Sequence, residues 1–260
     1  MIRFAAVAVV SIALACCCSS AQSPPASNPQ ALSYAAQSIA ALTGGTSISD
    51  VTLTGTVTWS GSDTGTATLR ALGTGESRID LVLTSGTRTE IRDAQTGAPL
   101  GEWINPNGAS GIFAYQNCFT DAVWFFPALG SLAGGPNVVL SYVGQETRGG
   151  IAVQHIRSYV YQSNSPSFPG PKTPQQLSTM DLFLDATTLL PLAVTYSSHP
   201  DDDANRNLPV EIDFSSYQTM SGVAVPTRIQ RYLQGTLIVD LTVSAASFNT
   251  GMSLSDFTIK

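Results

Sequence analysis

The sequence predicts a mainly β protein of the α+β class, with one curved antiparallel sheet, an N-terminal helix and a central helical insert. From Ile48 onwards, apolar side chains recur at every second residue, which is the period of a half-buried strand. Gly-rich turns separate these runs, as in an antiparallel meander. Helical spacing of apolar residues occurs before Ile48, and an unbroken apolar block lies near the middle of the chain.

Residues 1–21 have the features of a signal peptide. Arg3 gives a positive start, and Phe4 to Ala15 is apolar but too short to span a bilayer. Ser19-Ser20-Ala21 offers small residues for cleavage before Gln22. We therefore expect an exported protein that is periplasmic or associated with the cell envelope.

Lipidation at Cys16 is an alternative to simple cleavage. The small Ala15 before this cysteine favours a lipoprotein signal, whereas Ala13 stands where such signals prefer Leu. Contact with a membrane is expected only through this N-terminal anchor, because no other stretch is apolar over the ~18 residues that a span needs.

The composition argues against a nucleic-acid partner. The 260-residue chain has a formal net charge of −6 and only 12% charged residues, and an acidic protein binds polyanions poorly. Three of the four cysteines lie at residues 16–18, and the fourth is Cys118. Its neighbour Phe119 predicts a buried, inert thiol.

A polar linker and a helix precede the sheet. Residues 22–30 contain Pro, Ser and Gln and are expected not to pack. Asn28 and Pro29 suit the N-cap and first position of a helix, which Gly44-Gly45 ends. An apolar stripe on this helix is expected to cover the sheet; it comprises Leu32, Ala35, Ala36, Ile39 and Leu42. The remainder, residues 31–260, is expected to form one domain.

The first half of the sheet is predicted from alternating apolar residues. The alternating residues are Val51, Leu53, Val57 and Trp59, then Ala67, Leu69 and Ala71, then Ile79, Leu81 and Leu83, followed by a strand over Thr87 to Arg92. Turns are expected at 61–65, 73–75 and 93–97.

The block from Phe119 to Ala133 carries no charge after Asp121, and Pro127 should kink it or begin a second helix. It is apolar on nearly every face, so it forms either a core helix or a lid over a lipid-sized cavity. The candidate ligand-contacting residues are Val123, Trp124, Phe125, Phe126 and Leu129.

Strands are expected again from Val138 to Glu146 and from Ile151 to Gln162. The second of these has apolar groups on both faces, which predicts a helical cover on one face and a partly buried cavity on the other. A Pro-rich loop over 163–176 and an acidic loop over 200–208 interrupt the strands that follow.

Motifs for catalysis and metal binding are weak. Asp63-Thr64-Gly65 matches an aspartic-protease triplet but has no second copy, so a hairpin turn is the better interpretation. No Ser lies in a G-x-S-x-G elbow. The two histidines, His155 on a strand and His199 in a loop, have no ligand pattern around them. We therefore expect no catalytic residues and no cofactor.

The spacing of Asp201, Asp203 and Asn205 matches the opening of a calcium loop. Arg206 stands where that loop needs Gly, and Ile212 where it needs Glu, so a solvated surface loop is the better interpretation. No metal site is expected.

The last eighty or so residues resemble periplasmic lipoprotein-carrier (LolA/LolB-like) proteins. The resemblance rests on the punctuation of strands by Asp185, Leu190-Pro191, Gly222 to Pro226, Asn249 and Leu254 to Phe257. It implies an unclosed β half-barrel whose concave face is capped by helices and accepts acyl chains. The carrier family's functional residues have no identifiable counterparts in this chain.

Three hypotheses follow. The first is an exported, non-enzymatic protein that binds an acyl chain, lipid or other apolar ligand in the half-barrel. The second is an envelope module that binds a protein partner or acts as a sensor. The third is an enzyme of unrecognised type, for which no acid, base or nucleophile cluster is visible.

Overall fold

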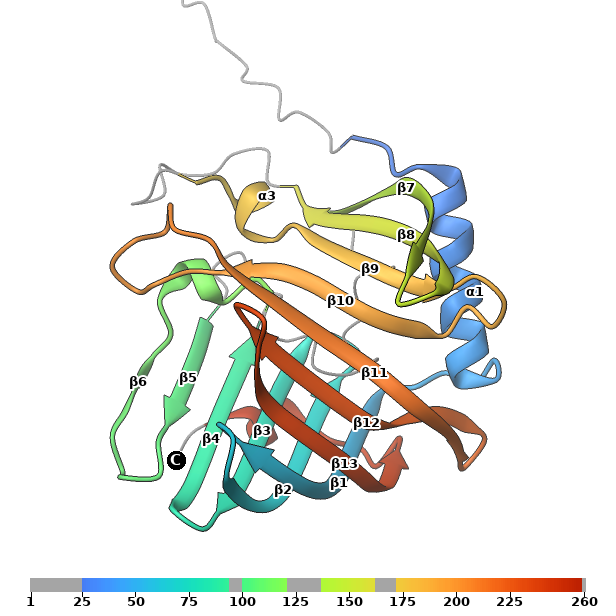
Figure 1. The fold of residues 1–260 in the computed structure, drawn as a ribbon. Coiled ribbons are helices and arrows are strands. Elements are labelled where there is room, and N and C mark those ends of the chain that lie inside the picture. The colour runs from blue at the N-terminus through green and yellow to red at the C-terminus, as the bar shows by residue number, and fades with distance from the viewer. Residues whose placement is uncertain (1–24, 94–99, 121–136, 162–171, 259–260) are drawn as a thin grey trace, which may run out of the picture.

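A computed structural model describes residues 25–93, 100–120, 137–161 and 172–258 (Figure 1). Cys16, the candidate contacts Val123, Trp124, Phe125, Phe126 and Leu129, and nearly all of the expected helical insert lie outside these residues. Of the block that begins at Phe119, only Phe119 and Thr120 are described, and both are buried.

Within the described residues, one antiparallel sheet of 13 strands has the order β6-β5-β4-β3-β2-β1-β13-β12-β11-β10-β9-β8-β7. Nearly every strand pairs with its neighbours in sequence, and β1 pairs with β13 to join the two halves. The edge strands β6 and β7 are consecutive in sequence and do not pair. The expected mainly β fold with an open sheet is therefore confirmed.

The first half of the sheet consists of strands β1 to β6. They are β1 (Asp50–Trp59), β2 (Asp63–Leu72), β3 (Glu76–Leu83), β4 (Gly86–Asp93), β5 (Leu100–Ile104) and β6 (Ser110–Ile112), followed by the short 3₁₀ helix η1 (Tyr115–Asn117).

The second half of the sheet consists of strands β7 to β13. They are β7 (Val138–Arg148), β8 (Ile151–Val160), β9 (Met180–Asp185), β10 (Pro191–Ser198), β11 (Leu208–Met220), β12 (Val223–Leu233) and β13 (Thr236–Phe248), with helix α3 (Pro174–Leu177) before β9 and the 3₁₀ helix η2 (Leu254–Phe257) at the end.

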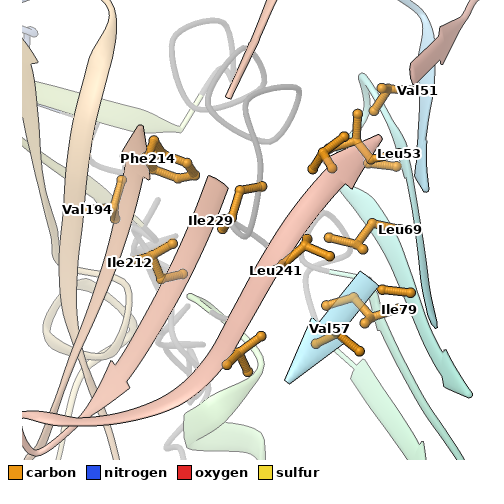
Figure 2. Close-up of a cluster of buried hydrophobic side chains, with 14 of the residues drawn as sticks. Val51, Leu53, Val57, Leu69, Ile79, Val194, Ile212, Phe214, Ile229 and Leu241 are labelled. Carbon is orange, nitrogen blue, oxygen red and sulfur yellow. The ribbon is translucent and has the colours of Figure 1, made fainter. Parts of the chain in front are cut away.

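One face of the curled sheet is apolar in both halves. Alternate residues of β1, β2 and β3 pack in a single cluster with alternate residues of β10 to β13. Figure 2 shows Val51 and Leu69 of the first half with Ile212, Ile229 and Leu241 of the second half, pointing toward the same interior. Figure 1 shows the sheet curved around this cluster. We call this the inner face and the opposite side the outer face.

Helix α1 spans Pro29–Thr43, as expected. Asn28 is its N-cap, with Oδ1 accepting from the amides of Gln30 and Ala31 at 2.9 and 3.1 Å, and Gly44 ends it in the left-handed conformation. The predicted apolar stripe was partly wrong. Leu32 is 42% exposed and Ala36 is exposed, while the buried residues are Ala31, Ala35, Ser38, Leu42 and Thr43.

Three smaller expectations needed correction. Pro226, expected at a strand start, lies inside β12 opposite Tyr217, next to an irregularity where Ser216 has a positive φ of 56°. Proline is tolerated there because β13 pairs with β12 only from Arg228 onward, so the missing amide of Pro226 lies where β12 has a single ladder partner. Pro174–Leu177 is a short helix capped by Thr173 rather than part of a loop. Asp63 to Gly65 begin β2 instead of completing a turn.

The end of the expected linker is also ordered against the sheet. The Ser27 hydroxyl accepts from the Leu140 amide at 3.0 Å, and the Asn28 amide donates to the Leu140 carbonyl at 2.8 Å. These bonds cover part of the exposed edge of β7, which would otherwise present free backbone groups to another strand.

Candidate functional site

The inner face is the first candidate for a functional site because it is a continuous apolar surface. Its largest fully buried side chains include Leu53, Leu69, Ile212, Ile229 and Leu241. An apolar surface of this kind could hold an acyl chain by the hydrophobic effect alone. In this structure its side chains are covered, so an apolar ligand would have to replace part of that cover.

Helix α1 provides some of the cover through small side chains. Ala31 and Ala35 pack against Leu140, Ile156 and Leu184 in one cluster, and Leu42 joins the main inner cluster. Tyr34 packs half-buried against the same cluster, with its ring centroid 5.4 Å from that of Tyr142. The helix is therefore held on the inner face by hydrophobic contact.

The inner face changes from apolar to charged at β4. Glu90 lies opposite Ile79 in the ladder, and Arg92 lies opposite Ser77, so both share the inner face. Arg88 makes a 2.6 Å salt bridge with Glu90, and Arg92 lies 3.6 Å from the same carboxylate. Glu90 and Arg92 are buried, which ties these charges to one another rather than to water.

The Arg92 guanidinium is also fixed by the segment that follows β6. It lies 3.4 Å from the centre of the Phe113 ring, and its Nη1 donates to the carbonyl of Asn117 at 3.2 Å. The charged end of the inner face therefore contacts η1 directly.

Asn117 continues this connection to the loop between β10 and β11. Its Nδ2 donates to the His199 carbonyl at 2.7 Å, and its Oδ1 accepts from the His199 amide at 2.8 Å. Figure 1 shows the turn after β6 beside this loop. His199, expected in a loop without a role, is buried, and its Nδ1 lies 3.0 Å from the Arg206 carbonyl.

A polar groove of about 700 Å³ lies on the other side of the sheet, across β9 to β12. Asp181, Glu211 and Asp213 line it from the outer face, because they alternate with inner-face residues such as Ile212. Tyr232 and Thr195 line it as well. The groove is an acceptor-rich surface, suited to a ligand that carries hydrogen-bond donors.

Two of the groove carboxylates have basic partners. Asp181 accepts from Nε of Arg157 at 2.8 Å and lies 2.9 Å from Nε2 of His155. Glu211 forms a salt bridge with Arg148, whose guanidinium lies 4.4 Å from the centre of the Phe183 ring. These contacts bring the tip of the β7–β8 hairpin over the outer face.

Asp213 differs from the other two carboxylates. Burial raises the pKa of Asp213 to about 6, and the adjacent carboxyl group of Glu211 adds to the rise. Asp213 therefore takes up a proton at a higher pH than an ordinary aspartate does.

β8 packs on both faces, as expected. Its outer face contacts other side chains where a cavity was predicted. Ile156 faces the α1 cluster on the inner side. On the outer side Val153 packs with Phe183, and His155 stacks on the Phe183 ring with centroids 4.5 Å apart. Charged side chains from β7, β9 and β11 complete that side.

Sequence reasoning missed several of these contacts. The two carboxylates of Glu211 and Asp213 could have been recognised, because residues two apart on a strand point to one face. Asn117 carried no such signal, since its partner His199 is 82 positions away.

Cys118 is buried, as expected. Across residues 25–93, 100–120, 137–161 and 172–258, no group of three or more His, Cys, Asp or Glu side chains could hold a metal ion.

The open curled sheet with a helix on its inner face is the LolA-like fold. No protein-family model matches the chain, and no curated protein matches it in sequence. Of the helices that the structure describes, none has the length and apolar character to cross a membrane.

Three solved structures share this fold at low sequence identity. One is described as an outer membrane lipoprotein-sorting protein domain from Vibrio parahaemolyticus, with a TM-score of 0.56 and 14% identity over 88% of this chain and 96% of that one. A DUF1329 family protein from Desulfovibrio piger has a TM-score of 0.53 and 11% identity over 90% and 98%. A LolA superfamily protein from Nitrosomonas europaea has a TM-score of 0.50 and 12% identity over 88% and 97%.

Proposed function

We propose that this chain is an exported, non-enzymatic binding protein whose inner face holds an acyl chain or another lipid-like ligand. The observation that carries the proposal is the single apolar cluster that joins both halves of an open sheet. A closed barrel of fixed size limits its contents, whereas an open sheet can widen to admit a chain. The LolA-like fold, shared with a lipoprotein-sorting domain, supports this choice.

Export is part of the same proposal. It is supported by the signal-like residues 1–21 and by the outer-membrane description of the relative from Vibrio parahaemolyticus. Lipidation at Cys16 stays a proposal that the mass of the mature N-terminus would test. The candidate contacts Val123, Trp124, Phe125, Phe126 and Leu129 also stay predictions.

Native mass spectrometry of residues 22–260, purified from a bacterial periplasm without detergent, tests ligand binding. A stoichiometric extra mass that extracts as lipid is the expected result. A clean apo mass that is unchanged after incubation with phospholipid would count against the proposal.

A matched pair of variants locates the site. Leu182 is half-buried on the inner face and packs against both inner clusters, whereas Val82 is 56% exposed on the outer face. We expect Leu182→Ser to weaken binding of a fluorescent fatty acid by about tenfold, the scale of one lost apolar side chain, and Val82→Ser to leave it unchanged. Equal loss in both variants would mean that the inner face is not the site.

The second candidate is an envelope interaction module, and the outer groove is the observation that favours it. Its lining of carboxylates, hydroxyls and Tyr232 suits a polar protein segment better than an acyl chain. A photo-crosslinking residue at Thr195, compared in cells with one at Val82, tests this candidate. A single protein captured only from the Thr195 site is the expected result, and capture from both sites would contradict it.

The absence of catalysis is likewise a proposal, and esterase and peptidase substrates test it. Turnover that survives purification and is lost on changing a single polar residue would overturn it.

A further inference from the structure

In the described residues, hydrogen bonds that belong to no backbone ladder also join the two halves of the curled sheet. From β6 through β1 and β13 to β10, each strand is joined to the next by a backbone ladder. β6 lies at one edge of the sheet, and β10 lies on the far half. The two regions nevertheless meet, because η1 directly after β6 bonds to the loop directly after β10 (Figure 1).

Side chains of η1 make this contact with the backbone of the loop. Besides the reciprocal pair between Asn117 and His199, the Ser198 hydroxyl donates to Oδ1 of Asn117 at 3.1 Å. Nε2 of Gln116 lies 2.9 Å from the Pro200 carbonyl and 3.0 Å from that of Asp201. None of these bonds belongs to a ladder, so they can break without unpairing any strand of the described sheet.

The contact is also of an all-or-none kind. Asn117 is 7% exposed and His199 is 3% exposed, so neither can exchange its protein partner for water while it stays in place. A buried amide that loses its partners is costly, which disfavours a half-open arrangement. Either the η1 side chains bond to the loop, or the two segments separate and both are solvated.

Neighbouring groups hold each half of the contact in position. Arg92 of β4 donates to the Asn117 carbonyl, which fixes η1 to the first half of the sheet. Nδ1 of His199 bonds to the Arg206 carbonyl, which fixes the conformation of the loop. Each part of the contact is therefore held in position by its own side of the sheet.

We propose that the Asn117–His199 contact is a latch that holds this end of the half-barrel closed, and that its opening exposes the inner face. The latch itself depends only on the described contacts. Its role in ligand entry rests on the proposed acyl-binding function.

Hydrogen–deuterium exchange at the His199 amide tests the latch directly. Asn117→Asp has the same shape but places a carboxylate against the His199 carbonyl, where Asn117 donates. We expect this variant to exchange the His199 amide about tenfold or more faster, while the amides between β1 and β13 stay protected. Unchanged exchange at His199 would overturn the latch.

Two further variants keep the test decisive. Asn107→Asp is the matched control, because Asn107 is exposed and only accepts from the Ala109 amide at 3.0 Å, which a carboxylate can also do. It should leave exchange at His199 unchanged. If Asn117→Asp fails to fold, Gln116→Ala removes the partly exposed bonds to Pro200 and Asp201 and should raise exchange at His199 by a smaller factor. No rise in Gln116→Ala would then overturn the latch.

Stopped-flow binding of a fluorescent fatty acid tests the role in entry. With the latch weakened, association and dissociation should both accelerate by about the same factor, so that Kd changes little. Faster exchange with unchanged binding rates would overturn the entry role and keep the latch. Absence of any fatty-acid binding in the unmodified protein would defeat the proposed function, and the exchange result would still decide the latch.

Discussion

Asp213 is the residue whose charge is most affected by its surroundings among the carboxylates of the outer groove. Its folded pKa of about 6 lies above the ordinary value of 3.8, so folding favours its protonated form. Its contribution to stability is therefore greatest at acidic pH. That contribution falls as the pH rises from the ordinary pKa through the folded one.

We expect Asp213→Asn to stabilise the protein at neutral pH and to have little effect near pH 4. The asparagine keeps the shape of the protonated carboxyl and removes the repulsion from Glu211. Urea unfolding midpoints between about pH 4 and pH 8 measure the difference. Asp201→Asn, at an exposed site, is the control, and a difference that grows toward acid would contradict the assigned cause.

His199 gives a second dependence on pH, with the opposite sign. Burial lowers the pKa of His199, the Arg206 carbonyl opposes this effect, and Lys172 and Asp203 add smaller contributions of opposite sign. A lowered histidine pKa means that the closed latch keeps its full stability above the ordinary value of 6.5. That stability is lost as the pH falls below 6.5 toward the folded pKa.

The protection factor of the His199 amide, corrected for intrinsic exchange, should therefore fall as the pH drops below about 6.5. An amide in the β1–β13 ladder should show no comparable fall. A protection factor that stays constant through this range would mean that the imidazole does not control the latch.

At the level of elements, helix α1 separates what periodicity can predict from what it cannot. The caps at Asn28 and Gly44 are local chemistry, and both were predicted correctly. The buried face was not, because Leu32 is more apolar than Ala31 and yet lies on the exposed side. A sheet that leaves little room above it selects small residues, and no pattern within the helix reveals that room.

Leu42 and Leu32 provide the corresponding stability test. Leu42 is 2% exposed, whereas Leu32 is 42% exposed. We expect Leu42→Ala to lower the free energy of unfolding by about 2–4 kcal/mol and Leu32→Ala by less than about 0.5 kcal/mol. Chemical denaturation of both variants measures this, and equal losses would place the buried face where the apolar stripe predicted it.

The strands also differ in how much of their structure the sequence predicts. Those with strict alternation, such as Val51 to Trp59 and Ile79 to Leu83, were predicted because each has one buried face. The strand over Thr87 to Arg92 was predicted without an assignment of its faces, and its charged residues Arg88, Glu90 and Arg92 point inward. Arg88 lies over the Trp59 ring there, and Arg92 contacts the Phe113 ring and the Asn117 carbonyl.

For the whole molecule, the sequence predicted a meander but not its closure. Strand order within each half follows from short turns. The pairing of β1 with β13 joins residues as distant as Val51 and Phe248, and no local signal specifies it. The half-barrel itself came from the resemblance of the C-terminal tail, and the LolA-like fold confirms it.

The placement of the unpaired edges between β6 and β7 has a consequence for folding. Read as a circle, the strands run in an unbroken order from β7 through β13 to β1 and on to β6, with the single sequence-distant pairing at β1–β13. A circular permutant that links the end of η2 to the start of α1 and begins before β7 would pair every described strand with a sequence neighbour. Its lower contact order should speed refolding by stopped-flow fluorescence while leaving the sheet unchanged, because less loop entropy is lost before the two halves meet. The natural chain instead completes its sheet only when its first and last strands find each other.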